Sequence, residues 1–177
     1  RGRSLPHDVT NALAAAAVCL ESGLATVADA AIALQKFKNA PHRIQFVGEK
    51  GGVRWFNDSK ATSPHAVSVA LKSFESIVLI AGGKNKGLDL SALAKQPSRM
   101  RAVVAIGDAS DEVARAFNGV CEVRSATTMQ EAVNTAGSIA QQGDVVLLSP
   151  GCTSYDWYAN YGQRGDDFMK CVSKLLS

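Results

Sequence analysis

The sequence lacks several patterns that would assign a protein class at once. No apolar run approaches the roughly 20 residues that a membrane helix needs, and we expect no signal peptide. The nineteen basic residues exceed the sixteen acidic ones by only three, and they form no stripe interleaved with aromatic side chains. We therefore expect no membrane partner and no nucleic-acid partner. A hydrophobic content of 46% is typical of a soluble globular domain.

Metal-binding and disulfide patterns are also missing. The four cysteines form no C-x-x-C pair, and the three histidines do not fall at zinc-ligand spacing. We expect free thiols in a reducing cytoplasm and no metal site in this chain.

The first part of the sequence predicts two alanine-rich helices within residues 8–36, separated at a Ser-Gly pair. Such helices have a thin apolar face that must pack against something else to be stable. Residues 36–41 then indicate a linker ending in proline, which favours an extended chain. Because the chain runs almost at once into a helix, we expect it to be a piece of a longer protein.

From Arg43 onward, the pattern alternates between short apolar strands and helices. Strands are expected at 43–47, 53–57, 77–81, 102–106, 121–124 and 145–148. Helices are expected at 64–74, 90–95, 110–117, 128–141 and 166–176. This alternation implies right-handed crossovers and predicts an α/β fold, with a Rossmann-like, mostly parallel sheet covered by helices on both faces.

The loops after the predicted strands are the candidate functional segments, because ligands of such sheets bind beyond the carboxyl ends of the strands. These loops are residues 57–62, 82–87, 107–109 and 149–154. Three of the four are rich in hydroxyl groups, lysines and glycines. Together they predict a pocket for an acidic small molecule along one edge of the sheet.

Each loop also has a simpler interpretation. Thr62 or Ser63 could merely cap the next helix, and residues 82–87, which lack the Walker A spacing, could form a solvated turn. Cys152 could be a nucleophile, but no histidine has a pattern that ties it to that role. The aromatic residues after it could stack on a ligand or simply pack. Residue chemistry alone therefore leaves open a stand-alone module that binds an anionic metabolite or a nucleotide.

At these loops, the sequence resembles the Mur ligases. The matching segments are PHDVTNALAAA (Pro6–Ala16), PHR (Pro41–Arg43), NDSKATSPHA (Asn57–Ala66), AGGKNKG (Ala81–Gly87) and LSPGCTSYDWYANYGQRGDDF (Leu148–Phe168). The third segment is the most specific, because sister ligases usually carry an Asp-Tyr-Ala-His-Asn-Pro type of sequence there. It resembles the branch of the family that adds D-glutamate.

The resemblance implies a place in a three-domain enzyme. Residues 1–37 would be the C-terminal helices of the central ATPase domain, and residues 41–177 the C-terminal, amino-acid-binding domain. The implied reaction joins D-glutamate to UDP-N-acetylmuramoyl-L-alanine through an acyl phosphate, with ATP and with Mg²⁺ whose ligands are expected in the missing central domain. The resemblance further implies a cytoplasmic monomer and an isolated chain without activity. A related ligase for another amino acid is the alternative.

The resemblance also implies roles for individual residues. Those matching nucleotide contacts are Asn11, Arg43 and Asp58, with Lys60 between the nucleotide and the amino acid. Those matching D-glutamate contacts are Thr62, Lys86 and Ser154, with Tyr155 and Tyr161 lining the same site. No catalytic base is assigned.

Overall fold

The computed structural model describes residues 6–37 and 39–177. The chain divides into two compact units, Arg1–Ala40 and Pro41–Ser177, which are described separately. No described helix in either unit is long and apolar enough to cross a membrane.

The first unit is a pair of helices, α1 (Pro6–Glu21) and α2 (Val27–Lys36), as the apolar spacing predicts. Thr26 caps α2 in a reciprocal arrangement with Asp29, in which each side chain accepts a hydrogen bond from the backbone amide of the other residue. The apolar side chains of the pair stay largely exposed, and Leu13 is 65% exposed.

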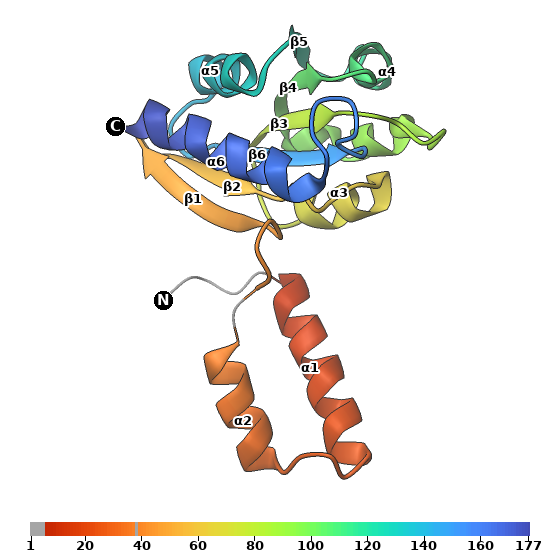
Figure 1. The fold of residues 1–177 in the computed structure, drawn as a ribbon, viewed down its shortest axis with the longest axis vertical. Helices are drawn as coiled ribbons and strands as arrows, with labels where there is room; N and C mark the ends of the chain where they lie inside the picture. The colour runs from red at the N-terminus through yellow and green to blue at the C-terminus, as the bar shows by residue number, and fades with distance from the viewer. Residues whose placement is uncertain (1–5, 38) are drawn as a thin grey trace. The chain divides into compact units, whose positions relative to one another are not determined.

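The second unit contains the strands and the remaining helices (Figure 1). The strands are β1 (Gln45–Lys50), β2 (Val53–Asn57), β3 (Ile77–Gly82), β4 (Met100–Ile106), β5 (Glu122–Ala126) and β6 (Val145–Gly151). The helices are α3 (Pro64–Leu71), α4 (Ser110–Ala116), α5 (Met129–Ile139) and α6 (Tyr161–Leu176), with short 3₁₀ turns η1 (Leu90–Ala94) and η2 (Pro97–Arg99).

The strands form one sheet in the order β1-β2-β6-β3-β4-β5. The strands from β2 to β5 run parallel, and only β1 is antiparallel to its neighbour. Helices α5 and α6 pack on one face, and α3, η1 and α4 cover the other. Every residue of β3 and β6 is buried, as expected for central strands of a sheet covered on both faces. The α/β fold class is confirmed.

Several element boundaries differ from the sequence-based prediction by a few residues, and two of these differences have a clear local cause. The first strand begins at Gln45 rather than Arg43, because His42 and Ile44 have φ values of 63° and 40°, which a strand does not adopt. The last helix begins at Tyr161, five residues before the predicted start, where Asn160 caps it by accepting a hydrogen bond from the Gln163 amide.

Candidate functional site

The loops after β2, β6, β3 and β4 lie along one edge of the sheet, as predicted. The strand register brings Asn57 opposite Leu148, and Gly82 opposite both Gly151 and Ile106. The four strands therefore end nearly level, and the polar segments that follow them emerge side by side.

Backbone hydrogen bonds join three of these loops directly. The Gly151 amide donates to the Ala61 carbonyl at 2.9 Å, which ties the loop after β6 to the loop after β2. Lys84 and Thr153 exchange two backbone hydrogen bonds of 2.8 and 3.1 Å, which tie the loop after β3 to the loop after β6. The predicted glutamate contacts lie within two residues of these bonded positions. They are Thr62, Lys86 and Ser154.

The first of these residues is not needed as a helix cap. Ser63 is the cap of α3, and its hydroxyl accepts from the Ala66 amide at 3.4 Å. The half-buried Thr62 hydroxyl has no hydrogen-bond partner among the described residues. The choice left open by the sequence is resolved in favour of Ser63 as the cap, which leaves Thr62 available to a ligand.

The loop after β3 is a largely exposed turn that Asn85 braces. The Asn85 amide group donates to the Glu112 carboxylate at 2.7 Å and to the Leu88 carbonyl at 2.9 Å, and its oxygen accepts from the Leu88 amide. Lys86 lies within this braced turn, and its side chain is exposed. Its ammonium group is therefore held on a structured loop and can reach an anion.

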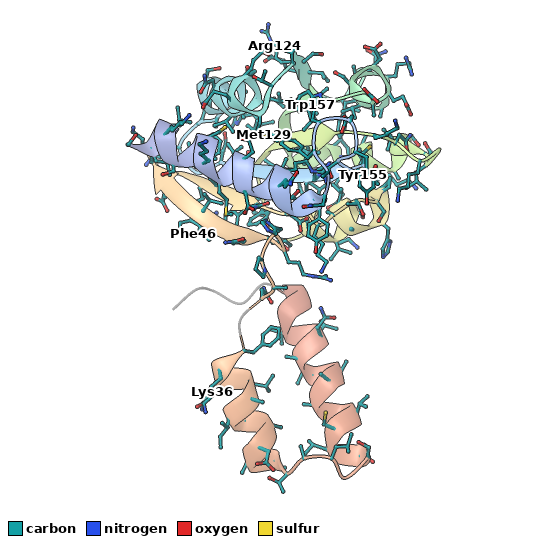
Figure 2. The ribbon with its side chains drawn as sticks, in the orientation of Figure 1. Lys36, Phe46, Arg124, Met129, Tyr155 and Trp157 are labelled. Atoms are coloured by element: carbon teal, nitrogen blue, oxygen red, sulfur yellow. The ribbon has the colours of Figure 1, made fainter. Side chains whose placement is uncertain are left out.

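The loop after β6 separates its residues into buried and exposed ones. Ser154 is 2% exposed, and its carbonyl accepts from the amides of Trp157 and Tyr158. Tyr155, labelled in Figure 2, is 65% exposed and can line a ligand site. Tyr158 instead donates its hydroxyl to the Asp167 carboxylate at 2.7 Å, so it packs within the unit.

Cys152 in the same loop does not have the properties of a nucleophile. Its side chain is buried, and this burial raises the pKa of the thiol to about 11. The thiol is therefore protonated at neutral pH, whereas nucleophilic cysteines need the thiolate.

Asp58 is a buried carboxylate at the start of the loop after β2. Its oxygens accept hydrogen bonds from the Ile44 amide at 3.2 Å and from the Ser149 hydroxyl at 2.8 Å. Burial raises the pKa of Asp58 to about 6, even though both hydrogen bonds and the charge of the nearby Arg43 lower it. Arg43 itself is exposed. Asp58 thus supports the turn that carries Arg43.

Lys60 and Tyr161 form a contact between the same loop and the start of α6. The Lys60 ammonium lies 5.5 Å from the centroid of the Tyr161 ring, a cation–π distance. The His42 ring also packs edge-on against the Tyr161 ring, with the two ring centroids 6.0 Å apart. Tyr161 remains 38% exposed, so it lines the edge while orienting Lys60.

Asn11 lies on α1 in the other unit, where its side chain is exposed, and its predicted contact with the nucleotide stays a prediction. A magnesium site has no support in the described residues, because no group of three or more His, Cys, Asp or Glu side chains in that part of the chain could hold a metal ion.

Arg164 is an important residue of this edge that the sequence did not reveal. It lies in α6, is 1% exposed, and donates hydrogen bonds to Ser59 and Cys152. The sequence-based prediction placed residue 164 in a loop before the last helix, so Arg164 was not recognised as a helical, buried residue. A signal was present, because Arg164, Phe168 and Val172 are spaced four residues apart and so share one helical face.

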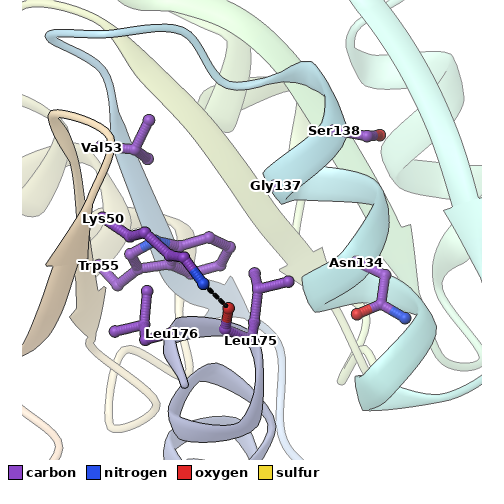
Figure 3. A pocket seen from close by; sticks show the side chains of 8 residues that line it. All are labelled: Lys50, Val53, Trp55, Asn134, Gly137, Ser138, Leu175 and Leu176. Carbon is purple, nitrogen blue, oxygen red and sulfur yellow. Dashed lines mark hydrogen bonds between the residues drawn. The ribbon is translucent and has the colours of Figure 1, made fainter.

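A surface groove lies at the opposite edge of the sheet. It has a volume of about 430 Å³, is lined by the start of β2 and the C-terminal halves of α5 and α6, and contains none of the predicted site residues (Figure 3). Trp55 lies in it beside Gly137, and Lys50 donates to the Leu175 carbonyl at 2.9 Å. The candidate site is thus a set of loops along an open edge, distinct from this groove.

A family model and curated relatives match most of the chain. The model "Mur ligase, glutamate ligase domain" matches residues 42–152. The UDP-N-acetylmuramoylalanine--D-glutamate ligase of Chlamydia caviae is 42% identical over 171 residues, covering 96% of this chain and 41% of the relative. The enzyme of the same name from Aquifex aeolicus is 38% identical, covering 94% of this chain and 40% of the relative. The chain thus spans about two fifths of the length of these relatives.

Solved structures show the same fold at lower identity. The UDP-N-acetylmuramate-alanine ligase MurC of Thermotoga maritima matches 98% of this chain and 39% of its own, with a TM-score of 0.70 and 17% identity. The MurF ligase of Thermotoga maritima, solved in complex with ADP, matches 99% of this chain and 40% of its own, with a TM-score of 0.65 and 18% identity.

Proposed function

The chain belongs to the Mur ligase family, and from this premise we propose that it forms the amino-acid-binding part of an ATP-dependent D-glutamate ligase. The proposed enzyme joins D-glutamate to UDP-N-acetylmuramoyl-L-alanine during peptidoglycan precursor synthesis in the cytoplasm. Relatives that carry the name of this activity are about 40% identical over nearly the whole chain. We assign residues 1–37 to the end of the central ATPase domain and residues 41–177 to the C-terminal domain.

The observation that carries the proposal is the linkage of the three loops that bear Thr62, Lys86 and Ser154, called the glutamate contacts below. Hydrogen bonds between the loops hold one cation and two hydroxyl groups at one edge. D-Glutamate brings two carboxylates, which need a cation and hydrogen-bond donors rather than a nucleophile or a metal. The exposed Lys86 ammonium supplies charge, and the Thr62 hydroxyl supplies a donor.

The nucleotide side of the proposed site is assigned to Arg43, Asp58 and Lys60, with Asn11 from the first unit. We assign Arg43 to the phosphates, because its exposed guanidinium is suited to them. Asp58 is assigned to the ribose. Its oxygens already accept two hydrogen bonds, but a carboxylate has about four lone-pair sites, so a ribose hydroxyl could still be bound.

The proposed reaction proceeds through an acyl phosphate. ATP phosphorylates the substrate carboxylate, the amine of D-glutamate attacks the acyl carbon, and phosphate leaves as the tetrahedral intermediate collapses. Residues of this chain contribute by orienting the amine and balancing the carboxylate charge. Magnesium would assist phosphoryl transfer, and its ligands are proposed to lie outside the described residues.

The test is a ligation assay on the complete enzyme with ATP and UDP-N-acetylmuramoyl-L-alanine, read out by product mass. We expect product with D-glutamate and none with L-glutamate. Product with a different amino acid alone would overturn the D-glutamate assignment. Absence of product with every amino acid would favour the anion-binding module. The isolated chain is expected neither to hydrolyse ATP nor to form product.

A further inference from the structure

Arg164 joins two loops of the candidate site from beneath. Its Nε donates to the Ser59 hydroxyl at 3.0 Å, and its Nη2 donates to the Ser59 carbonyl at 2.9 Å. Both terminal nitrogens also donate to the Cys152 carbonyl at 3.1 Å. A single guanidinium therefore links the loop after β2 to the loop after β6.

The partners of this buried cation are all neutral oxygens. No ion pair involves Arg164 within the part of the chain that the structure describes. Burial lowers the pKa of Arg164 to about 10, so the group is still charged at neutral pH. Burying a charge is costly, and a well-packed apolar side chain often stabilises such a position better. Four hydrogen bonds and the nearby charge of Asp156 offset part of this cost, and the rigid fork of donors is what an apolar side chain could not supply.

The linkage extends to the third loop through the residue after Cys152. Thr153 exchanges two backbone hydrogen bonds with Lys84, and its hydroxyl donates to the Lys84 carbonyl at 2.8 Å. On the other side, the Ser59 hydroxyl donates to the Tyr161 carbonyl at 2.7 Å, which fixes the first turn of α6 against the loop. All three loops are thus held in register with the guanidinium.

We propose that Arg164 is a positioning residue for the amino-acid substrate, whose planar fork sets the spacing of the glutamate contacts without touching the substrate. Each of the three positions in its network lies two or three residues before one of those contacts. These positions are Ser59, Cys152 and Lys84. The inference rests on the proposed function, because it concerns how that site recognises D-glutamate.

The experiment compares Arg164→Lys with wild type in the complete ligase. Lysine keeps the charge but loses the fork, so we expect the KM for D-glutamate to rise by about tenfold or more, because small displacements of binding groups are costly. The KM for ATP should change less, because Arg43 lies outside the linked loops and Asp58, although next to Ser59, is held by its own hydrogen bonds from Ile44 and Ser149. Equal changes in both KM values, or a wild-type KM for D-glutamate, would overturn the inference.

The matched control is Arg101→Lys. Arg101 pairs with Asp144 near the start of β6, at the opposite edge of the sheet. It is a structural arginine remote from the glutamate contacts, so its replacement should leave both KM values within about twofold of wild type. A rise in the KM for D-glutamate equal to that of Arg164→Lys would mean that any structural arginine has this effect, and would overturn the inference.

Two further measurements keep the inference testable. If Arg164→Lys does not fold, Ser59→Ala removes one acceptor of the fork and should raise the KM for D-glutamate selectively, by a smaller factor; an unchanged KM would overturn the inference. If the wild-type enzyme does not use D-glutamate, the proposed function fails, and amide exchange of Lys84 and Thr153 decides the linkage. Faster exchange in Arg164→Lys would support it, and unchanged exchange would overturn it.

Discussion

The Asp58 carboxylate accepts a hydrogen bond from the backbone amide of Ile44, fourteen residues earlier in the chain, at 3.2 Å. Ile44 has a φ of 40°, which is unfavourable for a β-branched residue. His42 also has a positive φ, and its carbonyl accepts from the Lys60 amide at 3.1 Å. The loop after β2 therefore stabilises the strained turn that presents Arg43.

The raised pKa of Asp58 predicts a specific pH dependence of stability. The carboxyl has a pKa of about 6 when folded and an ordinary value of 3.8 when unfolded. Below the unfolded pKa both states are protonated, and the group contributes nothing. As the pH rises from about 3.8 to about 6, the unfolded state ionises first, so the free energy of unfolding falls. The loss is complete above the folded pKa. A difference of about two pH units corresponds to about 3 kcal/mol.

Asp58→Asn should remove this dependence, because asparagine does not ionise. Urea denaturation of both proteins between pH 4 and pH 7.5 should show wild type losing about 2 kcal/mol relative to the variant, because part of the difference is already lost at pH 4. Asp89→Asn is the control of opposite sign: the hydrogen bond from the Ser91 hydroxyl lowers the pKa of this exposed carboxyl. Wild type should therefore gain stability relative to that variant as the pH rises to about the ordinary value of 3.8, so this control is measured below the pH range used for Asp58. A flat difference curve for Asp58→Asn would contradict the burial argument.

Substitutions of the neighbouring Thr62 and Ser63, at the start of α3, should affect binding and stability separately. Ser63→Ala removes the helix cap and should lower the free energy of unfolding by about 1 kcal/mol. Thr62→Ala removes a hydroxyl without an internal partner among the described residues, so stability should stay within about 0.5 kcal/mol of wild type. In the complete ligase, only Thr62→Ala should raise the KM for D-glutamate selectively. If Ser63→Ala raised the KM for D-glutamate and Thr62→Ala lowered the free energy of unfolding, Thr62 would be the cap and Ser63 the D-glutamate contact.

The two lysines of the loop after β3 make a second matched pair. Lys86→Ala removes the proposed cation, and losing a charge-assisted hydrogen bond should raise the KM for D-glutamate by about tenfold or more. The KM for ATP should change far less. Lys84→Ala keeps the backbone bridge to Thr153 and removes only an exposed side chain, so its effect should be small. Equal effects of Lys86→Ala on both KM values would remove its assignment.

The arrangement of the strands could be predicted because it depends on local patterns. The runs at 77–81 and 145–148 are continuously apolar, which is typical of buried parallel strands, and both lie within central strands. Once the sheet is parallel, its carboxyl edge collects the polar loops without further information. The Thr26 cap was predictable for the same reason, since its partner Asp29 is three residues away.

The less predictable features depend on contacts between distant segments. The positive φ at Ile44 is supported by Asp58, and no local pattern indicates it. Arg164 bonds to Ser59, 105 positions away, so its burial follows from the tertiary structure alone. Because Arg164 lies within the polar sequence QRGDD, local pattern predicts that it is exposed. Only the helical face that it shares with Phe168 indicates that it is buried.

The contact between Gly107 and the loop after β6 should be essential for the shape of the edge. Gly107 has a φ of 69°, and an added Cβ would overlap the Asp156 carboxylate and approach the Gly83 Cα to 2.7 Å. Asp156 occupies this position because it accepts a hydrogen bond from the Asp108 amide at 3.1 Å. A side chain at residue 107 would therefore push apart the loops after β3, β4 and β6.

Gly119→Ala separates this crowding from backbone strain. Gly119 has a φ of 75° but nothing within 4 Å of its added Cβ, so alanine there should cost only the left-handed strain of about 1 kcal/mol. Gly107→Ala should cost at least about 1 kcal/mol more, because overpacking adds to the strain. Urea denaturation of both variants measures the difference. In the complete ligase, Gly107→Ala should also raise the KM for D-glutamate, and Gly119→Ala should not. Equal losses of stability would mean that Asp156 moves aside freely and does not hold the edge together.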